Sequence, residues 1–265
     1  MTVDWPLLLL CLIGPMLFGV VLFHVVAGYY HIRYYVLRKH EPETWKIQAD
    51  RWLLPGQQRQ AALMSTGNLV LGGLVTGSLI YAITQGMPTL IYTDLDAYPV
   101  WWTVLSAPLL FVLNDAGAYY VHRALHHRPL FRRIHRHHHK FIATTPYVTI
   151  AVHPLELLAL QLSSFLPLFI LPFHAGVIGA VLIYILVFNI VDHSGVRLTS
   201  AIPWQGPSMY HDDHHTQFHC NFGQHLTLWD RLHGTLRRKK RTYGAEVFGG
   251  AGVPSGDGAD PFVEY

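Results

Sequence analysis

The chain has 265 residues, of which 51% are hydrophobic and 13% are charged, and its formal net charge is +3. That charged share is about half of the roughly 25% found in soluble domains. The apolar residues also form long blocks, which argues against an ordinary soluble protein and gives no sign of a nucleic-acid partner. Cys11 and Cys220 lie in an apolar and a polar segment respectively, so we expect two free thiols and no disulfide.

Five apolar blocks cover residues 6–28, 61–84, 99–121, 155–171 and 176–191. The first three are long enough for a helix to cross about 30 Å of hydrocarbon at ~1.5 Å per residue. The last two are short and predict a tilted hairpin around Pro172–Gly176 or a re-entrant pair. The first block is expected to be an anchor, because MTVDW carries no positive charge and the apolar run is too long for a cleaved signal peptide. The pattern predicts an all-α membrane fold with four to five transmembrane or re-entrant helices.

Lysine and arginine occur on only one side of the predicted membrane helices. The loops 29–60 and 122–154 and the segment after residue 191 together contain all 19 of them. The positive-inside rule therefore predicts that these segments face the cytoplasm. The expected location is the inner membrane of a bacterium or the endoplasmic reticulum of a eukaryote.

Histidine is the unusual residue, since all but three of the 19 histidines lie between His122 and His233. Residues three and four apart share one face of a helix, so three clusters each present imidazoles together. Imidazole suits iron, zinc, copper and nickel, and the number of imidazoles favours two metal ions. The clustered candidate ligands are His122, His126, His135, His138, His139, His211, His214 and His215.

Several further residues are candidates for supporting roles. Asp115 lies about two helical turns before His122, where its carboxylate is expected to hold the far nitrogen of a ligand imidazole. Asp192 is a weaker candidate for the same role. Ligation is left open for His153, His219, His225 and His233, whereas His24, His31, His40 and His174 are expected to be structural. Tyr119, Asn189 and Trp204 are candidates for a substrate pocket.

Residues 110–243 resemble the sterol desaturase and fatty acid hydroxylase superfamily. The resemblance rests on His122 to His126, then HHRPLFRRIHRHHH, TTPYVTIAVHPLE, DHSG and HDDHHTQFHCNFGQHLTLWDRLHGTLR. It implies a helical membrane protein whose cytosolic helical cap holds a histidine-bound di-iron centre. It adds His193 as a further ligand, and the DHSG element favours the sterol-type branch.

The resemblance also implies an organisation and a set of partners. Residues 1–98 are expected to form membrane helices and a cytosolic loop, 99–243 the catalytic region, and 244–265 a flexible tail. Two non-haem irons would use O2, and electrons from NAD(P)H would arrive through a small b-type cytochrome or a ferredoxin with its reductase. The sequence contains no fused haem domain, so this donor is expected to be external.

The predicted function is O2-dependent hydroxylation or desaturation of an unactivated C–H bond in a sterol-like membrane lipid. Acid–base groups cannot break such a bond, and zinc is redox-inert. An acyl-chain or other polar-lipid hydroxylase is the alternative within the superfamily. A membrane zinc hydrolase would be expected to carry a His-Glu-x-x-His helix, which is missing from the sequence. A non-enzymatic metal transporter would be expected to carry ionisable ligands in mid-span.

Overall fold

A computed structural model of the chain describes residues 3–200, 202, 205–244 and 252–265. Within them, four helices are long and apolar enough to cross a membrane: α1 (Trp5–Tyr30), α3 (Pro55–Thr84), α4 (Val100–Leu125) and α8 (Ala175–Asp192). The fourth apolar block forms the shorter α7 (Pro154–Phe165), which continues as the 3-10 helix η5 (Leu166–Phe169). The predicted all-α membrane fold is therefore confirmed, with four helices of spanning length and one short helix of the expected hairpin.

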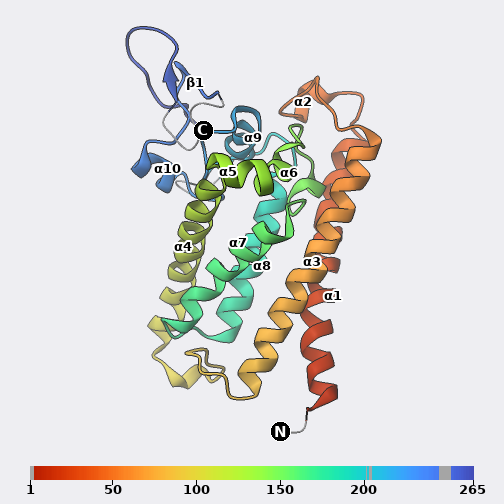
Figure 1. Ribbon diagram of the computed structural model, residues 1–265, viewed down its shortest axis with the longest axis vertical. Coiled ribbons are helices and arrows are strands. Elements are labelled where there is room, and N and C mark those ends of the chain that lie inside the picture. The colour runs from red at the N-terminus through yellow and green to blue at the C-terminus, as the bar shows by residue number, and fades with distance from the viewer. Residues whose placement is uncertain (1–2, 201, 203–204, 245–251) are drawn as a thin grey trace.

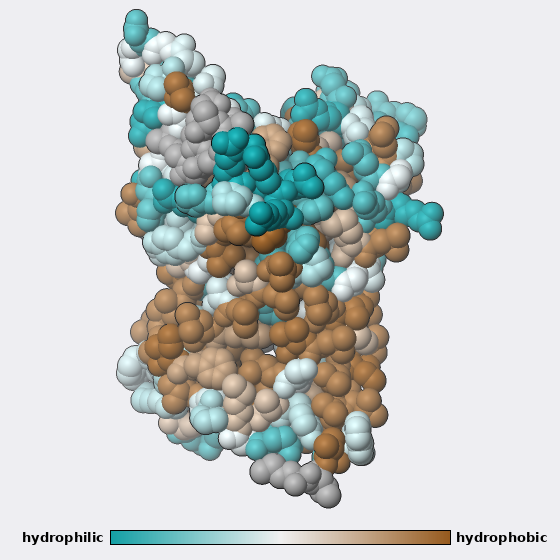
Figure 2. All heavy atoms as spheres, viewed as in Figure 1, coloured by the Kyte–Doolittle hydropathy of each residue, from teal (hydrophilic) through white to brown (hydrophobic). Residues whose placement is uncertain are grey.

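The lower part of the bundle has an apolar surface (Figure 2). Large apolar side chains point outward along these helices; Leu10 is 69% exposed, and Val104 is 64% exposed. Such a surface is unfavourable in water and suits hydrocarbon, where helices satisfy their own backbone hydrogen bonds.

Helices α1 and α3 pack closely because two glycines lie at their contact. A Cβ atom built on Gly73 would lie 2.4 Å from the Cα atom of Met16, and one on Gly77 would lie 2.2 Å from the carbonyl oxygen of Cys11. Real Cβ atoms do not approach other atoms this closely, so only glycine allows this separation of the two helices. Small residues four apart serve this purpose in many membrane helix pairs.

The end of the bundle near the N-terminus is closed by backbone contacts between two connections. The segment between α3 and α4 contains the 3-10 helix η2 (Leu95–Ala97), and Tyr92 pairs with the turn before α8. The Tyr92 amide donates to the Phe173 carbonyl at 3.1 Å, and Ala175 donates to the Tyr92 carbonyl at 2.8 Å. His174 has a structural role here, because its imidazole accepts a hydrogen bond from Gly176 at the start of α8.

The opposite end carries a cap of short elements (Figure 1). The π-helix η1 (His31–Val36) extends α1 into it, and α9 (Ser208–Gln217) lies near its centre. The other cap elements are α2 (Pro42–Trp45), α5 (Arg128–Leu130), the π-helix η3 (Phe131–His135), α6 (Arg136–His139), the 3-10 helix η4 (Pro146–Val148) and α10 (Leu228–His233).

The described part of the C-terminal segment packs on this cap. Strand β1 (Arg241–Thr242) pairs antiparallel with β2 (Val253–Pro254). The hydroxyl of Tyr265 donates to the Asp213 carboxylate at 2.6 Å and accepts from the Asn221 amide at 2.7 Å. Residues 252–265 belong to the tail that is expected to be flexible, and the end of this segment contacts the cap through these hydrogen bonds. Residues 245–251 lie outside the described part.

The contact between α1 and α3 yields a prediction about stability. Replacing Gly77→Ala forces the helices apart, and overpacking of this kind costs about 1–3 kcal/mol. The matched control is Gly67→Ala in the same helix, where a new Cβ meets no atom within 4 Å. The control is expected to be neutral or stabilising, because alanine favours helix over glycine. Thermal unfolding of both variants in detergent measures the difference, and equal melting temperatures would contradict the close contact.

Candidate metal centre

Nine buried imidazoles gather into two adjacent groups. Within each group, one ring nitrogen of every residue lies within 4.8 Å of the corresponding nitrogens of the others. The first group contains His122, His126, His135, His139 and His214, and the second contains His138, His193, His211 and His215. The structure thus brings together all nine residues that the sequence suggested as ligands.

Helical spacing explains the division between the groups. His122 in α4 and its C-cap residue His126 contribute to the first group, whereas His211 and His215 in α9 contribute to the second. In each of these pairs, the two residues are four apart and share a face. His214 is three residues after His211 and belongs to the first group.

The histidines around α6 divide in the same way. His135 and His139 are four apart and belong to the first group, and His138 belongs to the second. The expected three-ligand patches at 135–139 and 211–215 are therefore each split. Each short helix lies between the two groups and supplies imidazoles to both.

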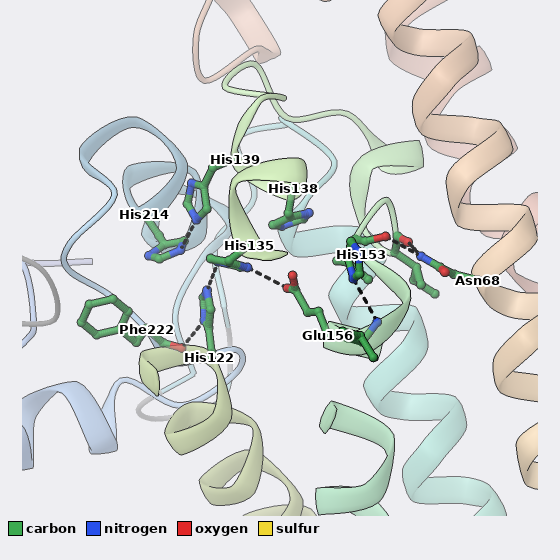
Figure 3. A network of polar contacts seen from close by, with 12 residues as sticks. Asn68, His122, His135, His138, His139, His153, Glu156, His214 and Phe222 are labelled. Carbon is green, nitrogen blue, oxygen red and sulfur yellow. Dashed lines mark hydrogen bonds and ion pairs between the residues drawn. The ribbon is translucent and has the colours of Figure 1, made fainter. Parts of the chain in front are cut away.

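Hydrogen bonds to Nδ1 decide where the protons sit on the facing imidazoles. His122 donates from Nδ1 to the Phe222 carbonyl at 2.8 Å, and His135 donates from Nδ1 to the Glu156 carboxyl group at 2.8 Å when that group is ionised (Figure 3). In that state their Nε2 atoms, which are 3.1 Å apart, both carry lone pairs. Two lone pairs facing each other repel, unless a cation lies between them.

In two further facing pairs, a carbonyl fixes the proton of one partner, whose Nε2 lone pair then points at the Nε2 atom of the other. His214 donates from Nδ1 to the Cys220 carbonyl at 2.7 Å, and its Nε2 lies 3.0 Å from that of His139. In the second group, His193 donates from Nδ1 to the Asn189 carbonyl at 2.8 Å, and its Nε2 lies 2.9 Å from that of His211. Two nitrogens about 2.1 Å from one ion, and at a right angle to each other, are about 3 Å apart. The spacings therefore fit a metal ion in each group.

Burial keeps these imidazoles neutral. It lowers the pKa of His135 to about 3 and that of His193 to about 4, and in both cases loss of solvation is the largest cause. The pKa values of His126, His138, His139, His211, His214 and His215 are all far below the ordinary value for the same reason. Neutral imidazole is the form that binds metal, so the site is prepared for cations at neutral pH.

Glu156, whose carboxyl group contacts an imidazole of the first group, was not predicted from the sequence. It lies in the first turn of α7, is 2% exposed, and accepts the Nδ1 proton of His135. Such a carboxylate orients a ligand imidazole and increases its basicity. The signal that could have identified Glu156 is an ionisable residue at the start of an otherwise apolar helix, in the segment Val-His-Pro-Leu-Glu.

Asp115 does not have the expected contact with a ligand imidazole. Its carboxylate accepts from the His225 amide at 3.0 Å and from the Trp229 indole at 2.8 Å. It therefore clamps the segment before α10 against α4. Asp192 does not contact a ligand imidazole either. Its carboxylate lies 3.5 Å from the His225 ring, and the neighbouring His193 donates to a carbonyl.

Asp230 organises the loop that orients two ligands. Its buried carboxylate accepts from the amides of Phe222 and Gly223 at 2.9 and 2.7 Å, and from the hydroxyl of Tyr210. A Cβ atom at Gly223 would lie 2.5 Å from the Tyr210 hydroxyl, so this loop requires glycine. The loop supplies the carbonyls that hold His122 and His214, which explains why the Asn-Phe-Gly and Trp-Asp-Arg elements accompany the histidines.

The remaining histidines lie outside the two groups. His153 caps α7, because its imidazole accepts from the Leu155 amide at 3.2 Å. His233 bonds to the Trp229 carbonyl, and His219 lies beside the ring of His126 with the ring centroids 5.6 Å apart.

An apolar cavity of about 360 Å³ lies between α4 and α8, within the usual range of ligand pockets, about 300–1,000 Å³. Its lining consists of Ala107, Pro108, Phe111, Ala180, Val181, Tyr184, Ile202, Gln205 and Leu226. Ala107, Phe111 and Asp115 are successive residues on one face of α4, and the same face leads to His122, about 16 Å beyond Phe111 along the helix.

Tyr119 and Asn189, which the sequence suggested for a pocket, do not line this cavity. Tyr119 bonds to the hydroxyl of Thr235 at 3.0 Å, and Asn189 accepts from His193 through its carbonyl. Trp204 lies outside the described residues. The cavity instead uses residues deeper in α4 and α8, together with two cap segments that reach down between these helices.

The fold and the two groups define a helical membrane protein whose cap holds two adjacent sets of histidines, each of which could hold a metal ion. The profile of the Fatty acid hydroxylase family matches residues 107–235. With the relatives described next, this shows that the chain belongs to the sterol desaturase and fatty acid hydroxylase superfamily, on its sterol branch.

Two relatives illustrate the similarity. A "Probable Delta(7)-sterol 5(6)-desaturase" of Neurospora crassa is 30% identical over 221 residues, covering 83% of this chain and 62% of the relative. A "Lathosterol oxidase" of Rattus norvegicus is 30% identical over 219 residues, covering 81% of this chain and 70% of the relative. The chain thus spans about three fifths of the length of the fungal relative. No solved structure matches it significantly.

Glu156 provides a test of the centre. Glu156→Leu removes the partner of His135 Nδ1, and losses of this kind weaken metal binding about 10–100-fold. Metal content measured by mass spectrometry after dialysis against a graded chelator is expected to fall at lower chelator concentration than in the wild type. Glu43→Leu, at an exposed carboxylate of the cap, is the matched control. Equal metal retention in both variants would contradict a role for Glu156.

Proposed function

We propose that this protein is an O2-dependent, non-haem di-iron oxidase that hydroxylates or desaturates an unactivated C–H bond of a sterol-like membrane lipid. The observation that carries the proposal is the set of neutral imidazoles whose Nε2 atoms face each other at about 3 Å in two adjacent groups. Imidazole donors suit iron, and bound iron would supply the redox chemistry that protein side chains lack.

The chain's own residues have three tasks in this proposal. Glu156 and the carbonyls of Phe222, Cys220 and Asn189 hold the ligand imidazoles in one tautomer and orientation. The cavity between α4 and α8 holds the apolar body of the lipid away from water. The cap covers both groups, whose members are all buried, and so excludes solvent from the reacting region.

A sterol-like substrate is supported by the relatives, which are named for the oxidation of sterols. The cavity supports it as well, because it is compact and mostly lined by apolar side chains. An acyl-chain or other polar-lipid hydroxylase remains the alternative within the superfamily. A zinc hydrolase is disfavoured because the sequence contains no His-Glu-x-x-His segment, and a transporter because the imidazoles lie at the cap end of the helices.

The proposed orientation places the cap in the cytoplasm, as the distribution of Lys and Arg predicts. Electrons would come from NAD(P)H through an external b-type cytochrome or ferredoxin with its reductase. The segment that carries His135, His138 and His139 exposes four arginines on its outer side, namely Arg128, Arg132, Arg133 and Arg136. Such a basic face suits an acidic donor protein.

Sterol oxidation by the purified protein, with a reductant and a donor protein, tests the proposal. We expect turnover in air and none under nitrogen, and we expect His214→Ala to lose metal and activity together. His40→Ala, at an exposed histidine outside both groups, should keep both. Undiminished turnover without O2, or full activity of His214→Ala, would refute the proposal.

A further inference from the structure

Between the cavity and the second histidine group lie buried polar atoms that lack partners among the described residues. His225 is 1% exposed and Asp192 is 5% exposed. Nε2 of His225 has no hydrogen-bond partner there, and Nδ1 of His225 and Oδ2 of Asp192 have only each other. The two side chains approach each other only to 3.5 Å, from Nδ1 to Oδ2. Buried polar groups are nearly always satisfied, so this cluster calls for a partner that protein atoms do not supply.

The cluster borders the cavity on its cap side. The ring of His225 lies 5.7 Å from that of Phe111 and 6.2 Å from that of Tyr184, measured between centroids, and both aromatic residues line the cavity. Asp192 directly precedes His193 of the second group. Asp115 holds the backbone of His225 in place. A lipid that extends from the cavity toward the histidines therefore has to meet this pair.

The chemistry of the pair selects one kind of ligand group. A carboxylate oxygen accepts a hydrogen bond and an imidazole N–H donates one, so together they match a hydroxyl, which does both. An anionic head group does not suit the place, because two carboxylates, Asp115 and Asp192, lie beside it and the described residues of the cavity lining include no Lys or Arg. A phosphate or a free fatty acid would be repelled there.

From this geometry we infer that Asp192 and His225 form a binding site for the hydroxyl group of the lipid substrate, at the cap end of the cavity. The hydroxyl donates to Asp192 Oδ2 and accepts from a His225 ring N–H, while the apolar body occupies the cavity. The substrate is then a lipid alcohol, which separates a sterol from an acyl chain. The inference rests on the proposed function and specifies its substrate class.

The test compares two probes that bind to the iron-loaded full chain in nanodiscs. One is a 3-hydroxysterol, and the other is the same sterol with hydrogen in place of the hydroxyl. We expect the wild type to bind the alcohol at least about tenfold more tightly, since an analogue that leaves buried polar groups unpaired is rejected. His225→Phe keeps a ring of similar shape and is expected to reduce the preference below about threefold, with unchanged iron content.

Two controls make the outcome decisive. His233→Phe, at an exposed histidine of α10, should keep the preference of the wild type. If His225→Phe does not fold, Asp192→Asn provides a second variant. The comparison of the two probes on the wild type also tests the hydroxyl site without any variant. Equal binding of both sterols by the wild type would overturn the hydroxyl site while leaving sterol oxidation intact. Binding of a fatty acid and of neither sterol would overturn the proposed substrate as well.

Discussion

The structure depends on one electrostatic constraint, which is the convergence of neutral imidazole nitrogens in a buried space. Facing lone pairs about 3 Å apart repel, and burial disfavours protonation, since the pKa values of His135 and His193 fall to about 3 and 4. A shared cation would resolve the conflict. Its binding free energy would then contribute to the folding of the cap, as is usual where a metal site has no preformed counterpart in the unfolded chain.

Several parts of the cap bind the Nδ1 protons of the imidazoles, so that their Nε2 atoms face the centre of each group. Asp230 shapes the loop whose carbonyls hold His122 and His214, and Glu156 holds His135 from the side of α7. The chain end adds a further layer, because Tyr265 bonds to Asn221 in the same loop. The membrane helices carry these parts at one end and leave an apolar cavity beneath them, so that oxidising chemistry and lipid meet at the border of cap and bundle.

The sequence predicted the helices and the gathering of the nine histidines because both follow from short-range patterns. Long apolar blocks determine spanning helices, and spacings of three and four determine which imidazoles share a face. The division into groups was not predictable, because it depends on where short helices such as α6 and α9 lie relative to each other.

Glu156 and Asp230 were missed, and Asp115 was given the wrong partner, because a single carboxylate has no periodic signal and its partner is set by tertiary contacts. The contacts of Tyr265 were not predictable for the same reason, since a tail rich in glycine shows no local preference that reveals them.

Iron X-ray absorption, combined with metal quantification on protein purified without added zinc, tests the central claim most directly. The account predicts two irons per chain, each surrounded by nitrogen donors at about 2.1 Å, with the multiple-scattering signature of imidazole. A single metal per chain, or a first shell dominated by sulfur or by oxygen alone, would contradict it.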